Sequence, residues 1–214
     1  GPFEVELEIE EQPWPMRVLD YTLPGDSHQT VLINAHNCHA FQANDDTSGV
    51  AVGIALMQRL AEAPRRLTYR LLIAPELQGP MFWLDAMPAS ERRNLMGALL
   101  LKSVGNRRDL RLQESFSGTS RMDRAAHHVL RARLGNYDHG PFRSIYGNDE
   151  TVFEAPPYRI PSITLTRWPF REYHSDADTP ERLSATHLDD CMEAAFEICM
   201  ALEADVAFLP RFEG

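Results

Sequence analysis

The strongest constraint on the fold is a repeated alternation of short apolar runs with segments of helical periodicity. The run "TVLINA" (30–35) is continuously apolar, and the segment 46–63 follows it with apolar residues at helical spacing. Asp46, Thr47 and Ser48 are the potential N-caps of that helix. Because continuous apolar strands are typical of sheets buried on both faces, the alternation predicts an α/β sheet covered by helices. Further strands are expected at 67–74, 97–104 and 162–166, and helices at 81–87, 89–96, 120–134 and from about Ser184 to Ala207.

The beginning of the chain has a different pattern. "FEVELEIEE" (3–11) alternates apolar and acidic residues, and "MRVLDYTL" (16–23) partly repeats this alternation after a turn. Period-two alternation predicts two antiparallel edge strands that form a hairpin. We expect residues 1–2 to be a tag scar and residues 3–214 to form a single catalytic domain, with room for a preceding domain.

Composition narrows the possible partners. The 214 residues include 43% hydrophobic side chains, which suffices for one substantial core. A net charge of -10 argues against binding to nucleic acid or to an anionic membrane, because both need a basic surface. No apolar run is long enough to cross a bilayer, and no signal peptide is visible. We therefore expect a cytoplasmic protein.

The cysteines agree with a reducing compartment. Their number is odd and no Cys-x-x-Cys pair occurs, which argues against a disulfide framework. Cys191 and Cys199 fall in the last predicted helix, where buried thiols are expected.

Polar clusters follow three of the predicted strands. His36 follows 30–35, Glu76 follows 67–74, and "EYHSDAD" (172–178) lies shortly after 162–166. Ligands of open α/β sheets bind outside the carboxyl ends of the strands, so these side chains are expected to meet. Imidazole and carboxylate are the ligands of hydrolytic zinc sites, and a carboxylate such as Glu76 beside activated water can act as a general base.

Several motifs resemble those of a known superfamily. "AHNC", "QANDDTSG", "APELQG" and "EYHSDADT" are similar to the motifs of the zinc-dependent aminopeptidases, a superfamily that includes bacterial leucyl aminopeptidases and glutaminyl cyclases. "HNCHAFQANDDTSG" and "YGNDETVFEAP" are more similar to its aminopeptidase-like branch, which is associated with polysaccharide and natural-product biosynthesis. The resemblance runs from about Val31 to Thr179. It implies a three-layer α/β/α fold with a mostly parallel central sheet and an antiparallel edge hairpin, the phosphorylase/hydrolase-like aminopeptidase fold.

The resemblance also implies roles for individual residues. His36 and His174 stand at positions of histidine ligands, and Asp45 stands at the position of the metal-bridging aspartate. Of the usual pair of glutamates, a base and a ligand, Glu76 alone remains, so it could take either role. Lys102 stands near the place of an expected ligand aspartate, and an ammonium group cannot replace that ligand.

We therefore expect one zinc ion per chain, bound by Asp45, His174 and one or both of His36 and His39. His39 is either a ligand or a hydrogen-bond donor to one. Helix capping and surface hydrogen bonding are the alternative explanation for these polar residues. Glu76 has an alternative as a turn residue at the end of a strand.

Other residues have expected roles around this site. Asp149, Glu150 and Tyr173 are expected to contact the substrate, although the two acidic residues could merely cap a turn. Asp178 is expected to support the loop of His174 as a hydrogen-bond acceptor.

Two further features have simpler interpretations. Cys38 is expected to be a small buried thiol beside the site rather than a nucleophile. The pair His127 and His128 lies in a predicted helix with several arginines, so we interpret it as part of a solvated helix face.

The function implied by the resemblance is a zinc-dependent aminopeptidase-like hydrolase. It would cleave an amino-terminal residue from a peptide, or a small aminoacyl amide, with Glu76 as general base. One alternative is a one-zinc aminoacyl cyclase or transferase, in which the substrate's own amine attacks. Another is a metal-binding module without catalytic turnover, for which the missing carboxylate ligands argue.

Overall fold

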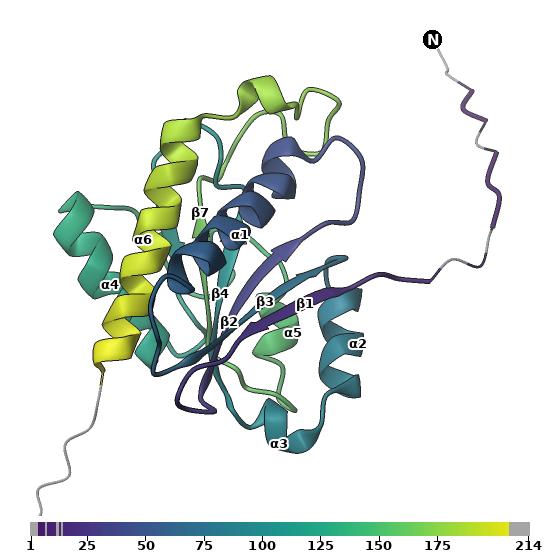
Figure 1. Ribbon diagram of the computed structural model, residues 1–214. Helices are drawn as coiled ribbons and strands as arrows, with labels where there is room; N and C mark the ends of the chain where they lie inside the picture. Colours follow the sequence, from purple (N-terminus) through teal and green to yellow (C-terminus); the bar gives the residue numbers. More distant parts are fainter. Residues whose placement is uncertain (1–3, 7, 12, 14, 206–214) are drawn as a thin grey trace, which may run out of the picture.

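The computed structural model describes residues 4–6, 8–11, 13 and 15–205. This part of the chain contains a seven-stranded sheet in the order β1-β3-β2-β4-β7-β5-β6 (Figure 1). The strands are β1 (Leu19–Leu23), β2 (Thr30–His36), β3 (Thr68–Ala74), β4 (Leu95–Lys102), β5 (Arg111–Gln113), β6 (His139–Gly140) and β7 (Ser162–Thr166). The helices are α1 (Ser48–Leu60), α2 (Gln78–Ala86), α3 (Ala89–Arg92), α4 (Arg121–Leu134), α5 (Glu150–Phe153) and α6 (Ala185–Ala204), with the helical turns η1 (Ala43–Thr47) and η2 (Pro180–Arg182).

The central strands of the sheet are parallel, and an antiparallel pairing lies on each side of them. Strand β2 pairs in parallel with β3 and β4, and β4 pairs in parallel with β7. Strand β1 is antiparallel to β3, β5 is antiparallel to β7, and β6 runs parallel to β5. The predicted α/β class with a mostly parallel central sheet is confirmed.

Helices cover both faces of the sheet. Along β2, Val31 and Ile33 belong to a core with α1, α4 and α6, whereas Leu32 belongs to a second core with residues of α2 and α5. Successive side chains of a strand point to opposite faces, so the apolar run of β2 supplies both cores. Figure 1 shows α1, α4 and α6 on one side of the sheet and α2 and α5 on the other. The expected three-layer arrangement is therefore present.

The predicted amino-terminal hairpin is wrong. The second of its two segments contains β1, but the described residues of the first, 4–6 and 8–11, form no strand. Val5 is 85% exposed and Ile9 is 75% exposed, so these two apolar side chains are not packed against the sheet. The antiparallel edge consists of β1 on β3. The expected tag scar at residues 1–2 lies outside the described residues.

The remaining predicted elements match with shifted ends. The strands β5 and β6, the helix α5 and the helical turns η1 and η2 were not predicted, and each of them has five residues or fewer. The last helix ends at Ala204, and residues 206–207 of its expected span lie outside the described residues. Cys191 and Cys199 are buried, as expected. None of the helices in the described ranges combines the length and the apolar composition that crossing a bilayer requires.

Candidate metal centre

Three adjacent parallel strands end at the same edge and deliver three polar side chains there. His36 is the last residue of β2, Lys102 is the last residue of β4, and Glu76 lies two residues beyond β3. Asp45 lies in η1, between β2 and α1. His174 reaches the same place from the loop after β7, because its imidazole contacts Asp45.

The loop that carries His174 is joined to the turn that carries Asp45 through Asp178. The Asp178 carboxylate accepts hydrogen bonds from the backbone N–H of Asn44 at 2.8 Å and of Asp45 at 3.0 Å. Asp178 is buried, which strengthens these charge-assisted bonds. Sequence reasoning placed Asp178 as a support for the His174 loop, and its observed partners are in the Asp45 turn.

Asp46 ties together the ends of three elements, a role that sequence reasoning missed. Its carboxylate accepts from the backbone N–H of His36 at 3.3 Å, of Gly49 at 3.2 Å and of Ser103 at 2.9 Å. A Cβ at Gly49 would lie 2.2 Å from the carbonyl oxygen of Leu101, so only glycine allows this close approach. Complete burial raises the pKa of Asp46 well above its usual value.

The two oxygens of the Asp45 carboxylate have different neighbours. Its Oδ1 lies 3.0 Å from His36 Nε2 and 2.7 Å from Lys102 Nζ. Its Oδ2 lies 3.3 Å from His174 Nε2 and 3.5 Å from His39 Nε2. Burial raises the pKa of Asp45, and a proton on His39 or His174 would oppose this shift. The structure thus brings together all four residues that were predicted as ligands.

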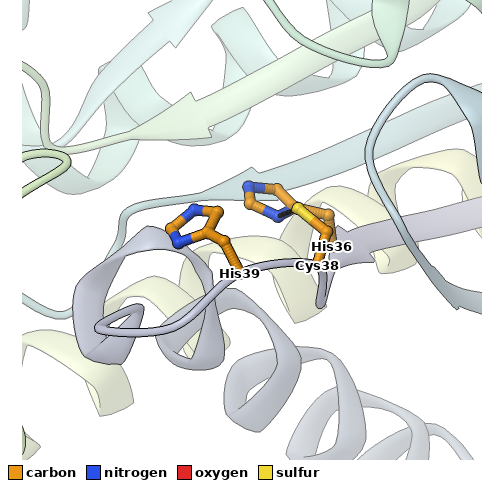
Figure 2. A group of neighbouring side chains, drawn as sticks. All are labelled: His36, Cys38 and His39. Atoms are coloured by element: carbon orange, nitrogen blue, oxygen red, sulfur yellow. Dashed lines mark hydrogen bonds between the residues drawn. The ribbon is translucent and has the colours of Figure 1, made fainter. Parts of the chain in front are cut away.

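The hydrogen bonds of His39 leave its Nε2 suited to a cation. Figure 2 shows His36 at the end of β2 and Cys38 and His39 on the segment that follows. His39 Nδ1 lies 2.8 Å from the carbonyl oxygen of Ala40, which can only accept, so Nδ1 carries a proton. A neutral ring then has a lone pair on Nε2, which is buried without a hydrogen-bond partner among the described residues.

This lone pair faces Asp45 Oδ2, which is also buried without a hydrogen-bond partner in the described part of the chain. Two facing acceptors require a cation between them or a second proton on the ring. The ligand atoms of His39, Asp45 and His174 all lie within 4.8 Å of one another. Two imidazoles and a carboxylate are a typical zinc donor set with one open position, so these residues fit the metal.

His36 is engaged on both ring nitrogens. Its Nε2 lies 3.0 Å from Asp45 Oδ1, and its Nδ1 lies 3.2 Å from the Cys38 sulfur. A thiol that donates to Nδ1 leaves the proton on Nε2, which then donates to Asp45. The expectation of a buried Cys38 is wrong, because the chain turns out toward solvent after β2 and this residue is exposed.

Lys102 is buried beside the proposed ligands. Its side chain is 2% exposed, and its Nζ lies 2.7 Å from Asp45 Oδ1 and 5.1 Å from the ring centre of Tyr146. Burial lowers the pKa of Lys102 to about 7, although the carboxylates of Asp149 and Glu150 favour its charged form. The Oδ1 side of Asp45 is therefore occupied by the amino group of Lys102, which belongs to the chain itself.

Glu76 is held at the same edge in a state suited to proton transfer. Its Oε1 accepts a hydrogen bond from Asn148 Nδ2 at 2.6 Å. Burial raises the pKa of Glu76 to about 7, and the negative charges of Asp149 and Asp45 act in the same direction. A general base works best when its pKa lies near the operating pH.

The acidic pair of the "YGNDE" loop is buried. Asp149 Oδ1 accepts from the backbone N–H of Leu77 at 2.6 Å, and Asp149 Oδ2 has no hydrogen-bond partner among the described residues. Both oxygens of Glu150 accept from the backbone N–H of Asn148, at 3.0 and 2.8 Å. Burial raises the pKa of Asp149 to about 6. Glu150 thus holds the loop, and Asp149 retains a free oxygen.

An aromatic cluster forms one wall of the site. The ring of Tyr173 stacks on His174 with centres 3.8 Å apart, and the ring of Trp168 lies against Tyr173 at 4.7 Å. The hydroxyl of Tyr146 donates to that of Tyr173 at 2.9 Å. Sequence reasoning named Tyr173 but missed Tyr146 and Trp168. A cavity of about 380 Å³ lies beside the imidazoles, lined by His39, Ala40, Phe41, His174, Ser175 and Asp176.

Known proteins share this arrangement of strands and helices. A curated relative from Clostridium acetobutylicum, described as a candidate polysaccharide biosynthesis protein with an aminopeptidase-like domain, is 24% identical over 209 residues. The match covers 97% of this chain and 48% of that protein, so the chain spans about half the length of the relative. The crystal structure of a candidate peptidase from the same species has a TM-score of 0.82 at 25% identity and covers 87% of this chain and 44% of that one.

Two more distant structures show the fold alone. A zinc aminopeptidase from Bacillus subtilis has a TM-score of 0.73 at 17% identity and covers 89% of this chain and 51% of that one. A glutaminyl cyclase from an Acidobacteriales bacterium has a TM-score of 0.73 at 15% identity and covers 88% of this chain and 74% of that one. The predicted resemblance to zinc aminopeptidases and glutaminyl cyclases is confirmed at the level of the fold. The family described as "Domain of unknown function (DUF4910)" matches residues 12–205, and the chain belongs to that family.

Proposed function

We propose that the chain is a zinc-dependent aminopeptidase-like hydrolase. It would remove the amino-terminal residue of a peptide or cleave a small aminoacyl amide. The observation that carries this proposal is the pair of facing acceptors, His39 Nε2 and Asp45 Oδ2, which are buried together without hydrogen-bond partners among the described residues. Glu76, with a pKa of about 7, lies close enough to Asp45 for their charges to interact.

Zinc would be held by His39, Asp45 and His174, and His36 would orient Asp45 from its other side. The position of Lys102 indicates which of the two histidines, His36 or His39, would bind the metal. The Nζ of Lys102 lies 2.7 Å from the oxygen that His36 contacts, so Lys102 already occupies this side of Asp45 and, when protonated, would repel a metal ion there. His39 faces the opposite oxygen, 3.5 Å away. We therefore assign one metal to this centre.

The chain's own residues would carry the proton transfers. When bound, zinc supplies Lewis acidity, which polarises a carbonyl and lowers the pKa of water to about 7. Glu76 would accept the proton of the attacking water and return it to the leaving amine. The hydrogen bond from Asn148 Nδ2 to Glu76 Oε1 fixes the position of this carboxylate.

The substrate would enter beside the two imidazole ligands His39 and His174. The cavity of about 380 Å³ at His39 and His174 has room for a single side chain. Asp149, whose Oδ2 is unpartnered among the described residues, offers a negative charge for a free α-amino group. Tyr173 stacks on His174 and would contact the substrate beside the metal.

A one-zinc aminoacyl cyclase or transferase is the second candidate. It would use the same residues, with the substrate's own amine in place of water. The observations in its favour are the contact of Lys102 with Asp45, which leaves one proposed metal at this centre, and the similarity in fold to a glutaminyl cyclase, 74% of whose chain is covered. Exclusion of water by the wall of Tyr146, Trp168 and Tyr173 would favour this reaction.

One experiment separates these functions. The zinc-loaded chain is incubated with a panel of aminoacyl arylamides and with glutaminyl peptides, before and after removal of metal by a chelator. Release of the arylamine that stops with chelation and returns with zinc supports the hydrolase. Loss of ammonia from glutaminyl peptides supports the cyclase. Tight zinc binding with neither activity would leave the metal-binding module as the explanation.

A further inference from the structure

A second group of side chains of the kinds that bind metals lies beside β5 and β6, at the side of the sheet opposite β1. Glu114 follows β5, His139 begins β6, and His127 lies in α4. Within the described residues, none of the three side chains forms a hydrogen bond or an ion pair with a residue of the first centre. The interpretation of His127 as a solvated residue is wrong, because it is partly buried and contacts Glu114, whereas His128 is exposed.

The fold positions these three residues. Strand β5 pairs in parallel with β6, and the ladder continues with a hydrogen bond from the Glu114 N–H to the Gly140 carbonyl at 2.9 Å. Leu112 packs in the core with residues of α4, and side chains two apart on a strand share a face. Glu114 therefore faces the helix that carries His127.

The donor atoms converge on one carboxylate oxygen. Glu114 Oε1 lies 3.2 Å from His127 Nε2 and 2.8 Å from His139 Nδ1, and the two imidazole rings are 5.0 Å apart. Tetrahedral zinc with ligands at 2.0–2.1 Å places the ligand atoms about 3.3 Å apart, so small shifts would suffice. The three ligand atoms all lie within 4.8 Å of one another.

A neighbouring side chain orients one of the rings. The Tyr137 hydroxyl is hydrogen-bonded to His127 Nδ1, so the ring presents Nε2 to Glu114. Hydrogen bonds to the distant nitrogen of a ligand histidine are typical of metal sites. The His139 side chain is 44% exposed, which leaves a path for an ion from solvent.

We propose that Glu114, His127 and His139 form a second metal site, separate from the first and selective for zinc-like ions. Two imidazoles and one carboxylate favour zinc and its neighbours over calcium or magnesium, which prefer oxygen ligands. The bound ion would join α4 to the β5–β6 edge and would stabilise the folded chain.

The test is the zinc content of the full chain after equilibrium dialysis against buffered zinc, measured by elemental analysis. His127→Gln and His139→Gln keep hydrogen-bonding capacity but remove a ligand, so each is expected to bind one equivalent fewer than the wild type. His128→Gln, the matched control on the same helix, is expected to equal the wild type. Because the comparison is a difference, it holds whether or not the first centre binds zinc.

A second readout uses thermal unfolding in a His174→Ala background, in which the first centre is disabled. At a zinc concentration of about 100 times Kd, zinc is expected to raise Tm by about 5 °C or more. Addition of His127→Gln should abolish this shift. Equal zinc content in the wild type and in both ligand variants, or an equal loss in His128→Gln, would overturn the proposal.

Discussion

Substitution of Glu76 by glutamine isolates its proposed chemistry from its packing. The two side chains have the same size, and the amide oxygen of Gln can still accept the bond from Asn148 Nδ2, now 2.6 Å long. What is lost is the ability to take up a proton. A positioned general base contributes about 100-fold or more to the rate, so kcat should fall by about 100-fold or more. That loss corresponds to about 2.7 kcal/mol in activation free energy.

The assay compares the zinc-loaded wild type and Glu76→Gln on one aminoacyl arylamide, with zinc content measured on the same samples. The expected result is a low kcat with unchanged zinc. Gln78→Ala, which changes an exposed side chain two residues away, serves as the control and should keep full activity. If Glu76→Gln instead loses zinc and added zinc restores turnover, Glu76 is a ligand. Full activity together with full zinc content would refute both roles.

Three further predictions concern the metal and the pH dependence. His174→Ala should weaken zinc binding at this centre by more than the roughly 10–100-fold that loss of a supporting contact costs, with little effect on folding because the side chain is 54% exposed. A zinc content of the dialysed variant equal to that of the wild type would contradict this. Lys102→Asp replaces the amino group 2.7 Å from Asp45 Oδ1 by a carboxylate, so one additional zinc ion should bind between His36 and Asp45. An unchanged number of zinc ions per chain by elemental analysis would show that Lys102 does not exclude a metal. Glu76 must be ionised to accept a proton, and a bound cation favours its ionised form. The value of kcat/KM should therefore rise with pH, with a midpoint at or below about 7. A kcat/KM that falls with pH across this range would contradict the role of Glu76 as general base.

The central fold was predictable because its strands are buried on both faces. The apolar runs 30–35 and 67–74 coincide with β2 and β3, since strands buried on both faces are apolar along nearly their whole length. The alternation of residues 3–11 resembles that of an amphipathic strand and therefore predicted one, yet the described apolar side chains Val5 and Ile9 are exposed. Short elements such as β5 and β6 carry too few residues for a periodic signal, and neighbouring elements stabilise them.

It was predictable that the polar clusters would lie close together, but the individual contacts of their side chains were not predictable. His36, Asp45, Glu76 and His174 follow strands whose carboxyl ends share one edge, so the topology alone brings them near each other. Which histidine faces which oxygen of Asp45 depends on the turn after β2 and on side-chain rotamers. The partners of Lys102 depend on residues far away in the sequence, and no local pattern encodes such contacts.

Anomalous diffraction at the zinc absorption edge tests the assignment of the first centre most directly. Crystals of the full chain carrying His127→Gln, grown with one equivalent of zinc, would restrict the metal to this centre. The account predicts a single peak about 2.0–2.1 Å from His39 Nε2, Asp45 Oδ2 and His174 Nε2. A peak between His36 and Lys102, or no peak near Asp45, would contradict it.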